Sequence, residues 1–498
     1  MPLLTRKKQL AAVKQTGSAL ASGLTSASNA TAIVLDAAAA LEIERIERNL
    51  LRDSITAVKD LTGLQAGSIT FGVEMKGTQA GSHASGAPSW GIFLQACGFR
   101  QVEVSFASIG AITSGPFRHG ELVTQTGTAA TARVVMDAHS GVATLYLETA
   151  TISGSPNSSG VWTGQDSGAT ATPTTAPAAE GFGWYPITDP IKTITFNGTG
   201  LTAAVAVGDL IAGITSGARG IVSRVTGTGV DAVVYFRPVR GSFTNGEVVQ
   251  RITPNADADI GTLAAANAEA FFDWPPLSMR LYEDGTATTL AGCRGNVVFN
   301  FEVNRPVRMD FSFRGVVNST ADVPMLGGVA YDNATPPVWE TSTIGFSRSD
   351  DNAYAATASE VSPCITTLNV DMGVQIVDRK CAGATSGLLE VYGSQRNATG
   401  SMNPEATLEA DIAWLGRVSD GEVCRLKTTV GSVDGNRFTV AMPGIQFTGV
   451  STGDRDSILV RDMQFRLTGG DLYDLVASPT TLSSIGGNNE LVFIYHTS

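Results

Sequence analysis

The sequence of 498 residues has few cysteines, few charged residues and no long apolar run. Its five cysteines are scattered and none forms a Cys-x-x-Cys pair, which argues against a disulfide framework and a zinc site. Charged residues make up only 16% of the chain and the net charge is −12, which argues against a basic nucleic-acid-binding surface. Because no apolar run approaches a membrane span, we expect no such span.

Motifs for catalysis or ligand binding are also missing. The four histidines lack the spacing of metal ligands, and we expect His83 and His496 to be solvated. The glycine-rich runs lack the lysine and helix of a phosphate loop, and no acidic segment has the ligand spacing of a calcium loop. We therefore predict no cofactor, no metal and no enzymatic activity.

Glycine, threonine, serine and alanine are abundant instead, with 55 glycines in the chain. Such a composition is typical of a mainly β fold with many turns. The N-terminus has a basic start, but Lys14, Gln15 and Thr16 interrupt the apolar stretch that a secretion signal needs. We expect an Ala/Ser-rich arm or a short helix over residues 1–40.

The most informative stretch runs from Phe71 to Phe99. Alternation over Phe71, Val73 and Met75 predicts a half-buried strand, which leads into a Gly/Ser loop. Ala87-Pro88 then introduces a predicted helix from Trp90 to Cys97, which Gly98 ends. We expect Trp90, Phe93 and Leu94 to face the core.

A pattern of an apolar residue, two spacers, a glycine and an acid or amide recurs in the middle of the chain. Its copies begin at Phe117, Val161, Val205 and Phe243, and the segment from Gly120 to Val135 is similar to that from Gly208 to Ser223. The repeat predicts a tandem duplication of a small β module. We place the two inserted modules at residues 107–190 and 191–270.

Strand patterns resume after the modules. Asp284-Gly285 predicts a hairpin turn, the segment from Gly292 to Gly295 a tight corner, and 297–303 with 307–313 a strand pair closed by Arg314-Gly315. Further on, residues 366–375 alternate strictly, and residues 404–417 have helical spacing, with Leu408, Ile412 and Leu415 on one stripe.

These motifs resemble the major tail tube proteins of long-tailed, siphovirus-type bacteriophages. In that family a strand and a Gly-rich loop lead to an Ala-Pro-x-Trp-Gly helix and a Cys-Gly-Phe stop, as between Phe71 and Phe99. An Asp-Gly turn and an Arg-Gly-Asn corner before two long strands also match, although Cys293 stands where alanine is common. The resemblance covers residues 41–106 and 271–498.

The resemblance implies two β-sandwich/barrel domains, each with a flanking helix. The first is discontinuous, over 41–106 and 271–345, and the second spans 346–498. Copies are expected to form rings whose sheets join into an inner β-barrel, and the rings to stack into a tube for DNA. The expected partners are copies of the chain, a tape-measure protein and tail terminator and tip proteins. The expected location is the virion tail, after assembly in the host cytoplasm. A trimeric ring with pseudo-sixfold symmetry is favoured, and a hexamer is possible.

The resemblance also assigns roles to residues. Candidate lumen-facing residues are Glu42, Glu44, Asn369 and Asp371, although an exposed sheet edge with cross-strand ion pairs explains them equally well. Candidate inter-ring contacts lie in the Gly/Ser loop, at Gly77, Gly81, Ser82, His83 and Gly86.

Two other functions remain open. A receptor- or carbohydrate-binding tail adhesin could use Trp162, Trp184, Tyr185 and Trp274 as sugar platforms, although buried core aromatics are the more common arrangement. A polysaccharide depolymerase needs paired catalytic carboxylates, and the sequence places no such pair.

Overall fold

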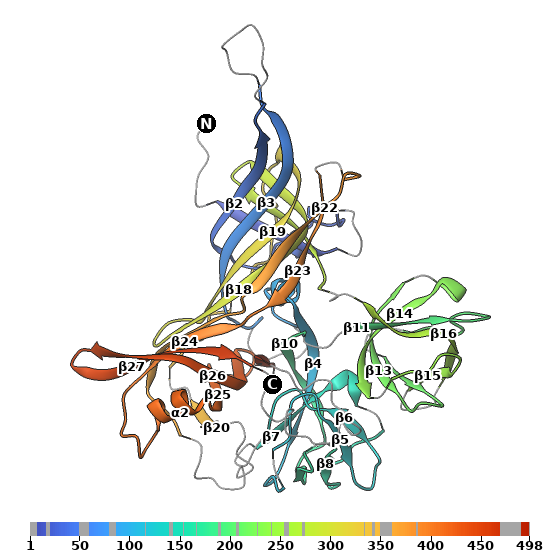
Figure 1. The fold of residues 1–498 in the computed structure, drawn as a ribbon, viewed down its shortest axis with the longest axis vertical. Helices are drawn as coiled ribbons and strands as arrows, with labels where there is room; N and C mark the ends of the chain where they lie inside the picture. The colour runs from blue at the N-terminus through green and yellow to red at the C-terminus, as the bar shows by residue number, and fades with distance from the viewer. Residues whose placement is uncertain are drawn as a thin grey trace.

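The computed structural model confirms the mainly β fold, with 57% strand and 5% helix (Figure 1). The structure describes residues 7–15, 20–48, 59–78, 86–114, 116–138, 143–152, 154–165, 167–187, 191–205, 209–226, 228–240, 242–252, 258–270, 274–332, 334–340, 344–348, 361–384, 387–468 and 490–497.

Six antiparallel strands and a helix form a first unit. They pair in the order β1-β17-β18-β19-β3-β2. The elements are β1 (Lys8–Lys14), β2 (Leu35–Ile46), β3 (Leu61–Glu74), α1 (Gly91–Ala96), β17 (Leu277–Glu283), β18 (Thr286–Glu302) and β19 (Arg308–Asp322).

A second unit repeats this arrangement in the same chain order. Its strands pair as β20-β25-β26-β27-β24-β21, and β22 and β23 continue the β21–β24 hairpin as a separate two-stranded sheet. The elements are β20 (Gly345–Arg348), β21 (Ile365–Asp371), β22 (Val374–Lys380), β23 (Leu388–Arg396), β24 (Thr399–Pro404), α2 (Trp414–Asp420), β25 (Val423–Val430), β26 (Arg437–Arg455) and β27 (Ile458–Leu467).

The two units share one sheet because β21 pairs with the end of β18, from Val298↔Asp371 to Glu302↔Thr367. On the other side, β28 (Val492–His496) pairs with β26 and carries β10 (Ala178–Pro186), β4 (Phe99–Ser108) and β7 (Thr144–Glu148). In Figure 1 the β2–β3 hairpin projects at the top and the β26–β27 hairpin at the left.

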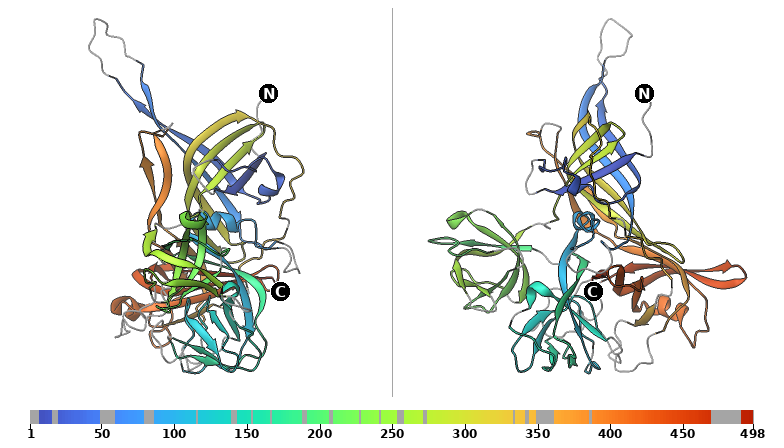
Figure 2. Two further views of the ribbon diagram at one scale, coloured as in Figure 1. Left: turned by 90° about the vertical axis from the view of Figure 1, so that its right-hand side faces the viewer. Right: turned by 180° about the vertical axis from the view of Figure 1, so that it is seen from behind.

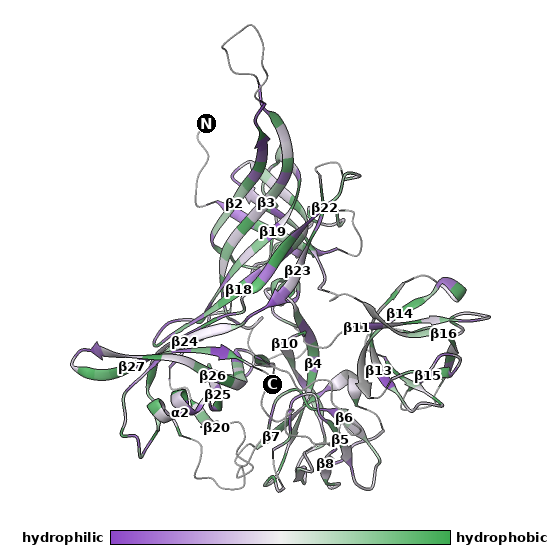
Figure 3. Ribbon diagram, in the orientation of Figure 1, coloured by the Kyte–Doolittle hydropathy of each residue, from purple (hydrophilic) through white to green (hydrophobic). Residues whose placement is uncertain are grey.

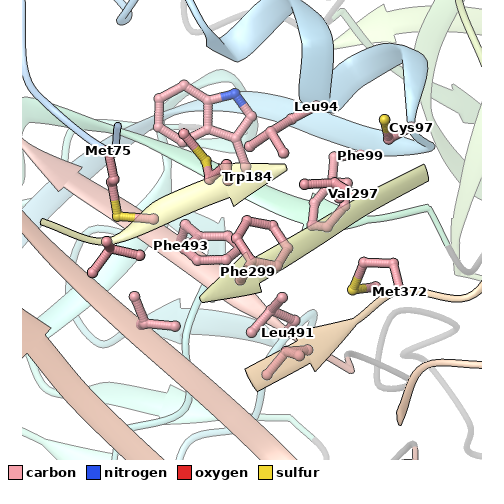
Figure 4. Close-up of a cluster of buried hydrophobic side chains, with 14 of the residues drawn as sticks. Met75, Leu94, Cys97, Phe99, Trp184, Val297, Phe299, Met372, Leu491 and Phe493 are labelled. Atoms are coloured by element: carbon pink, nitrogen blue, oxygen red, sulfur yellow. The ribbon is translucent and has the colours of Figure 1, made fainter. Parts of the chain in front are cut away.

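The core lies against one face of this sheet. Trp90 and Trp184 pack with ring centroids 4.8 Å apart, and Phe299 and Phe493 lie 4.6 Å apart, so the helix, the first unit and the C-terminal strand meet in one cluster (Figure 4). The other face of the sheet is more exposed, because side chains alternate along each strand. On β18, buried Val297, Phe299 and Phe301 alternate with more exposed residues.

The inserted segments have their own cores. A four-stranded sheet forms from β5 (Leu122–Gln125), β6 (Thr131–Arg133), β8 (Trp162–Gly164) and β9 (Thr170–Ala171). A closed barrel forms from β11 (Ile191–Phe196), β12 (Leu210–Gly213), β13 (Arg219–Thr226), β14 (Val233–Arg240), β15 (Val248–Ile252) and β16 (Ala258–Ala270). Figure 2 shows both lying apart from the β2–β3 hairpin.

Several sequence predictions are wrong at particular elements. Residues 8–14 form strand β1, in which Leu10, Ala11 and Ala12 are buried beside β17, and not a free arm or a helix. The segment from Gly292 to Gly295 is a bulge inside continuous β18, where Gly292 has a φ of 64°. Arg314-Gly315 likewise lies inside β19 and does not close the strand pair.

The helix predicted over 404–417 is displaced. Pro404 ends strand β24, and the helix spans Trp414–Asp420. Leu408 is 74% exposed and Leu415 is 42% exposed, whereas Trp414 is buried against Phe346 with ring centroids 5.0 Å apart. Ile412 is the one residue of the predicted stripe that is buried, and it lies before the helix begins.

Candidate assembly surfaces

The sheet face opposite the core carries a hydrogen-bonded row of polar side chains. Asn369 donates to Asn300, whose own amide donates to Asp310 at 2.8 Å. Asp371 accepts from Asn296 at 2.7 Å and from the backbone N–H of Gly373 at 2.8 Å. The predicted residues Asn369 and Asp371 thus belong to a polar face that crosses the joint between the units.

Glu42 and Glu44 lie farther along, on strand β2. Glu42 forms an ion pair with Arg314, which also binds Asp378 through two bonds of 2.8 and 2.9 Å. Arg314 donates to Asp378 and so lowers the pKa of that carboxyl. Glu44 is exposed and accepts a long bond from the N–H of Leu64 at 3.4 Å. The polar face carries arginines beside its acids, so it is mixed in charge rather than acidic.

Two strand edges lie open among the described residues. β2 pairs with β3 along one edge only. On β26, β25 covers one edge as far as Gln446, while residues 447–455 pair only with β27 on the opposite edge. Sequence patterns cannot reveal such edges, because alternation gives the faces of a strand and not its neighbours.

The projecting end of the β2–β3 hairpin exposes apolar side chains as well. Exposed fractions are 45% for Leu41, 43% for Ile43, 47% for Ile46 and 50% for Leu61. Figure 3 shows hydrophobic and hydrophilic residues alternating along this hairpin. A two-stranded ribbon with exposed aliphatic residues is typical of a segment that another surface covers.

The predicted inter-ring loop is described only at its ends. Gly77 is buried, and its N–H donates to Asn436 Oδ1 at 2.8 Å. Gly86 is half-buried with a φ of 76°. Gly81, Ser82 and His83 lie outside the described residues. The loop therefore starts from a fixed point against the turn between β25 and β26.

The three residues predicted for the core helix are all buried. Trp90 precedes α1 and donates from Nε1 to the backbone carbonyl of Lys76 at 2.8 Å. Phe93 packs against Phe71 with ring centroids 4.9 Å apart, and Leu94 is fully buried.

The recurring glycine motif forms the same turn in both inserted segments. Gly120 and Gly246 have φ angles of 76° and 83°, and the following glutamates, Glu121 and Glu247, are buried. Each glutamate accepts from the backbone N–H three residues before it and from the N–H and hydroxyl of one serine. The copy that begins at Val161 is different, because its Gly164 matches Gly213, the glycine that precedes a Ser-Gly-Ala turn.

Glu247 is expected to hold the barrel turn as a carboxylate. Burial alone would raise its pKa, but bonds from Thr244, Ser216 and Thr215 outweigh this and lower the pKa. Glu247→Gln should destabilise the barrel by about 1.5–3 kcal/mol. Hydrogen exchange on the full chain should then be at least 10-fold faster in β12–β16, whereas exposed Asp231→Asn should leave it unchanged. Equal exchange in both variants would contradict this role.

His496 is buried, so the expectation that it is solvated is wrong. Arg437 donates to Nδ1 at 2.9 Å, since arginine has no acceptor, and Nε2 lies 2.8 Å from the Thr439 hydroxyl. Burial, with Arg437 and Lys427 nearby, lowers the pKa of His496 to about 3.

The depressed pKa of His496 predicts acid sensitivity. Between pH 6.5 and the folded-state pKa the unfolded chain binds the extra proton, so stability falls as pH falls. From pH 6.5 to 5 the loss from this one group is about 1.6 kcal/mol. Urea unfolding at both pH values should show a smaller loss for His496→Gln than for the natural chain. Identical losses would rule out His496 as the cause.

The four aromatic residues considered as sugar platforms are all buried: Trp162, Trp184, Tyr185 and Trp274. None of them offers a ring face to a carbohydrate. Among the described residues, no group of three or more His, Cys, Asp or Glu side chains is placed to hold a metal ion. In the same part of the chain, no helix is both long and apolar enough to cross a membrane.

Comparison with known proteins gives no family assignment. The sequence matches no protein-family model, and no curated protein matches it.

Proposed function

We propose that this chain is the structural subunit of a phage-type tail tube, in which copies join into rings and the rings stack around a channel for DNA. The sequence resemblance between Phe71 and Phe99 supports the class of protein. One structural observation carries the proposal: the position that β21 occupies on β18 is open at the equivalent place on β26 among the described residues.

The joint between the two units of one chain, where β21 pairs with β18, shows how one strand edge is shared by two partners. β18 pairs with β19 along one edge, and along the other edge with β17 first and then with β21. β26 pairs with β27 and β28 along one edge, and with β25 first along the other. Because β25 is the equivalent of β17, the place after Gln446 is where the equivalent of β21 belongs.

The equivalent of β21 in the first unit is β2, whose outer edge is also open among the described residues. Within one chain β2 lies at one end of the shared series of strands and β26 lies inside it, with six strands between them. A second copy satisfies both edges at once, since its β2 can pair antiparallel with residues 447–455 of the first. Edge pairing that repeats from copy to copy forms a ring when the rotation per copy closes, and a closed ring removes the exposed edges.

The presence of two similar units in each chain favours three copies per ring. Each chain supplies two units, so three chains supply six units in a ring with pseudo-sixfold symmetry. Rings of six chains are the alternative. Stacking of rings is a head-to-tail contact, which gives an open-ended filament.

The polar face of the sheet is the proposed channel lining, with Asn369 and Asp371 near its centre. Two arginines of this face are paired with acids: Arg308 binds Asp310 at 2.6 Å and Asp36 at 3.2 Å, and Arg314 binds Asp378 and Glu42. Arg466, which is aligned with Asp371 through Thr399, donates instead to the neutral amide of Gln446 at 2.9 Å. Pairing of the two arginines reduces the free positive charge that phosphates could bind, which supports passage of DNA without tight binding. The inserted segments are proposed as outward decoration, and no catalytic role is proposed.

Negative-stain microscopy of the purified protein tests this function. Rings and hollow tubes are the expected result. Isolated trimers that bind cells and never polymerise would contradict it and support an adhesin instead. Six chains per ring in the assembled particle would overturn the trimer, and modules inside the channel would overturn the decoration.

A further inference from the structure

The β22–β23 hairpin of the second unit covers a surface of the first unit. Leu388 and Val391 form a buried cluster with Ala66 of β3, and Val316 of β19 packs against it. Asp378 of the same hairpin binds Arg314 of β19. The β22–β23 hairpin, called the internal hairpin below, therefore has its partner surface within the same chain.

The equivalent hairpin of the first unit, the projecting end of β2–β3, is called the external hairpin. Its aliphatic side has no such partner surface among the described residues. The projecting end of β2–β3 takes the place of β22–β23 in the first unit, because each continues the hairpin that forms the unit's outer strands. Its aliphatic residues Leu41 and Ile43 are 45% and 43% exposed, whereas Leu388 is 2% exposed and Val391 is fully buried. The aliphatic side chains on one side of this element are covered in the second unit and exposed in the first.

The sides of the two hairpins correspond. The core side of β21 continues into the covered side of β22, since Val370 is buried in the core and Val374 and Ile376 follow with the same alternation. On β2 the core side is marked by Ala39, which pairs with buried Ile69. Leu41 and Ile43 continue that side. The external hairpin therefore exposes the side that the internal hairpin buries.

A matching apolar site lies on the other side of β22–β23. Val377 and Tyr392 are directly paired across the two strands, and each is 38% exposed. They alternate with Asp378 and Val391, which face the first unit. If the contact between hairpins repeats around a ring, the next hairpin lies on this Val377–Tyr392 side.

We propose that Leu41 and Ile43 of one copy pack on Val377 and Tyr392 of its neighbour in the ring. This inference rests on the proposed function, because only ring closure brings a neighbouring first unit beside the second unit. It adds a second contact to each joint, made by side chains rather than by strand edges. The contact buries aliphatic side chains that are 45% and 43% exposed in the single chain.

Disulfide cross-linking tests the contact. Ile43→Cys and Tyr392→Cys are combined in a chain whose exposed cysteines are removed by Cys364→Ser and Cys381→Ser. After mild oxidation of assembled protein, we expect covalent dimers and larger oligomers in most of the sample. The control variant combines Ile43→Cys with Val433→Cys. Val433 is 61% exposed in the turn between β25 and β26, and this variant should remain monomeric after oxidation.

The outcomes separate this inference from the function it rests on. Tubes that form normally but give no cross-link between positions 43 and 392, or that cross-link equally in the Val433 control, overturn the hairpin contact and leave the tube function standing. A protein that forms neither rings nor tubes overturns both.

Discussion

A proline on the open edge of β2 is expected to abolish ring assembly without unfolding the chain. Proline removes a backbone N–H and leaves the facing carbonyl without its hydrogen bond, which costs about 1–3 kcal/mol. At each joint this corresponds to association roughly 5- to 100-fold weaker, and the losses at successive joints of a ring combine. No tubes should then appear in microscopy at concentrations where the natural chain forms them.

Ala39→Pro and Ala40→Pro form a matched pair for this test. Successive N–H groups of an antiparallel strand point to opposite edges, so one variant loses a bond toward β3 and the other an N–H that points outward. The variant with the smaller loss in thermal stability identifies the outward N–H, and that variant should stay monomeric. Normal tubes from this variant would contradict edge pairing.

Gly77→Ala is expected to cause the largest loss of stability from a single methyl group. A Cβ at Gly77 would lie 1.9 Å from the backbone oxygen of Gly435, and backbone cannot move aside as a flexible side chain can. Overpacking of this kind costs about 1–3 kcal/mol, and the backbone shift that relieves the clash adds about 1 kcal/mol by weakening the bond from the N–H of residue 77 to Asn436. We expect a total of about 3 kcal/mol in chemical unfolding of the full chain.

Gly327→Ala is the matched control, because no atom lies within 4 Å of a Cβ at that exposed position. Its effect should stay within about 0.5 kcal/mol. Equal stability of the two variants would show that Gly77 does not join the end of the first unit to the turn between β25 and β26.

Local signals predicted the elements that depend on neighbouring residues in sequence. The helix expected from Trp90 to Cys97 spans Gly91–Ala96, and the Asp284-Gly285 turn connects β17 to β18. Both depend on punctuation that acts within a few residues: proline and glycine at the helix, and positive φ at the turn.

Elements that depend on distant contacts were not predictable in this way. The stripe from Leu408 to Leu415 has helical spacing, yet the N–H of Ala406 bonds to Leu459 on β27 and keeps the chain extended there. The strict alternation over 366–375 hides a break at Gly373, whose φ is 58°. His496 has no sequence signal for burial, because its neighbours Arg437 and Thr439 come from another strand.

The candidate site divides in the same way. Alternation identified Asn369 and Asp371 on one face of a strand, but not that Asn300 and Asn296 of β18 would bind them. The open edges of β2 and β26 follow from strand order, which depends on the whole chain.

The most direct test of the proposed joint is a cryo-electron-microscopy map of the assembled particle at a resolution that traces strands. We expect β2 of each copy to pair antiparallel with residues 447–455 of its neighbour, at the place that β21 takes on β18. A particle in which these two edges do not meet, or a chain that never assembles, would contradict it.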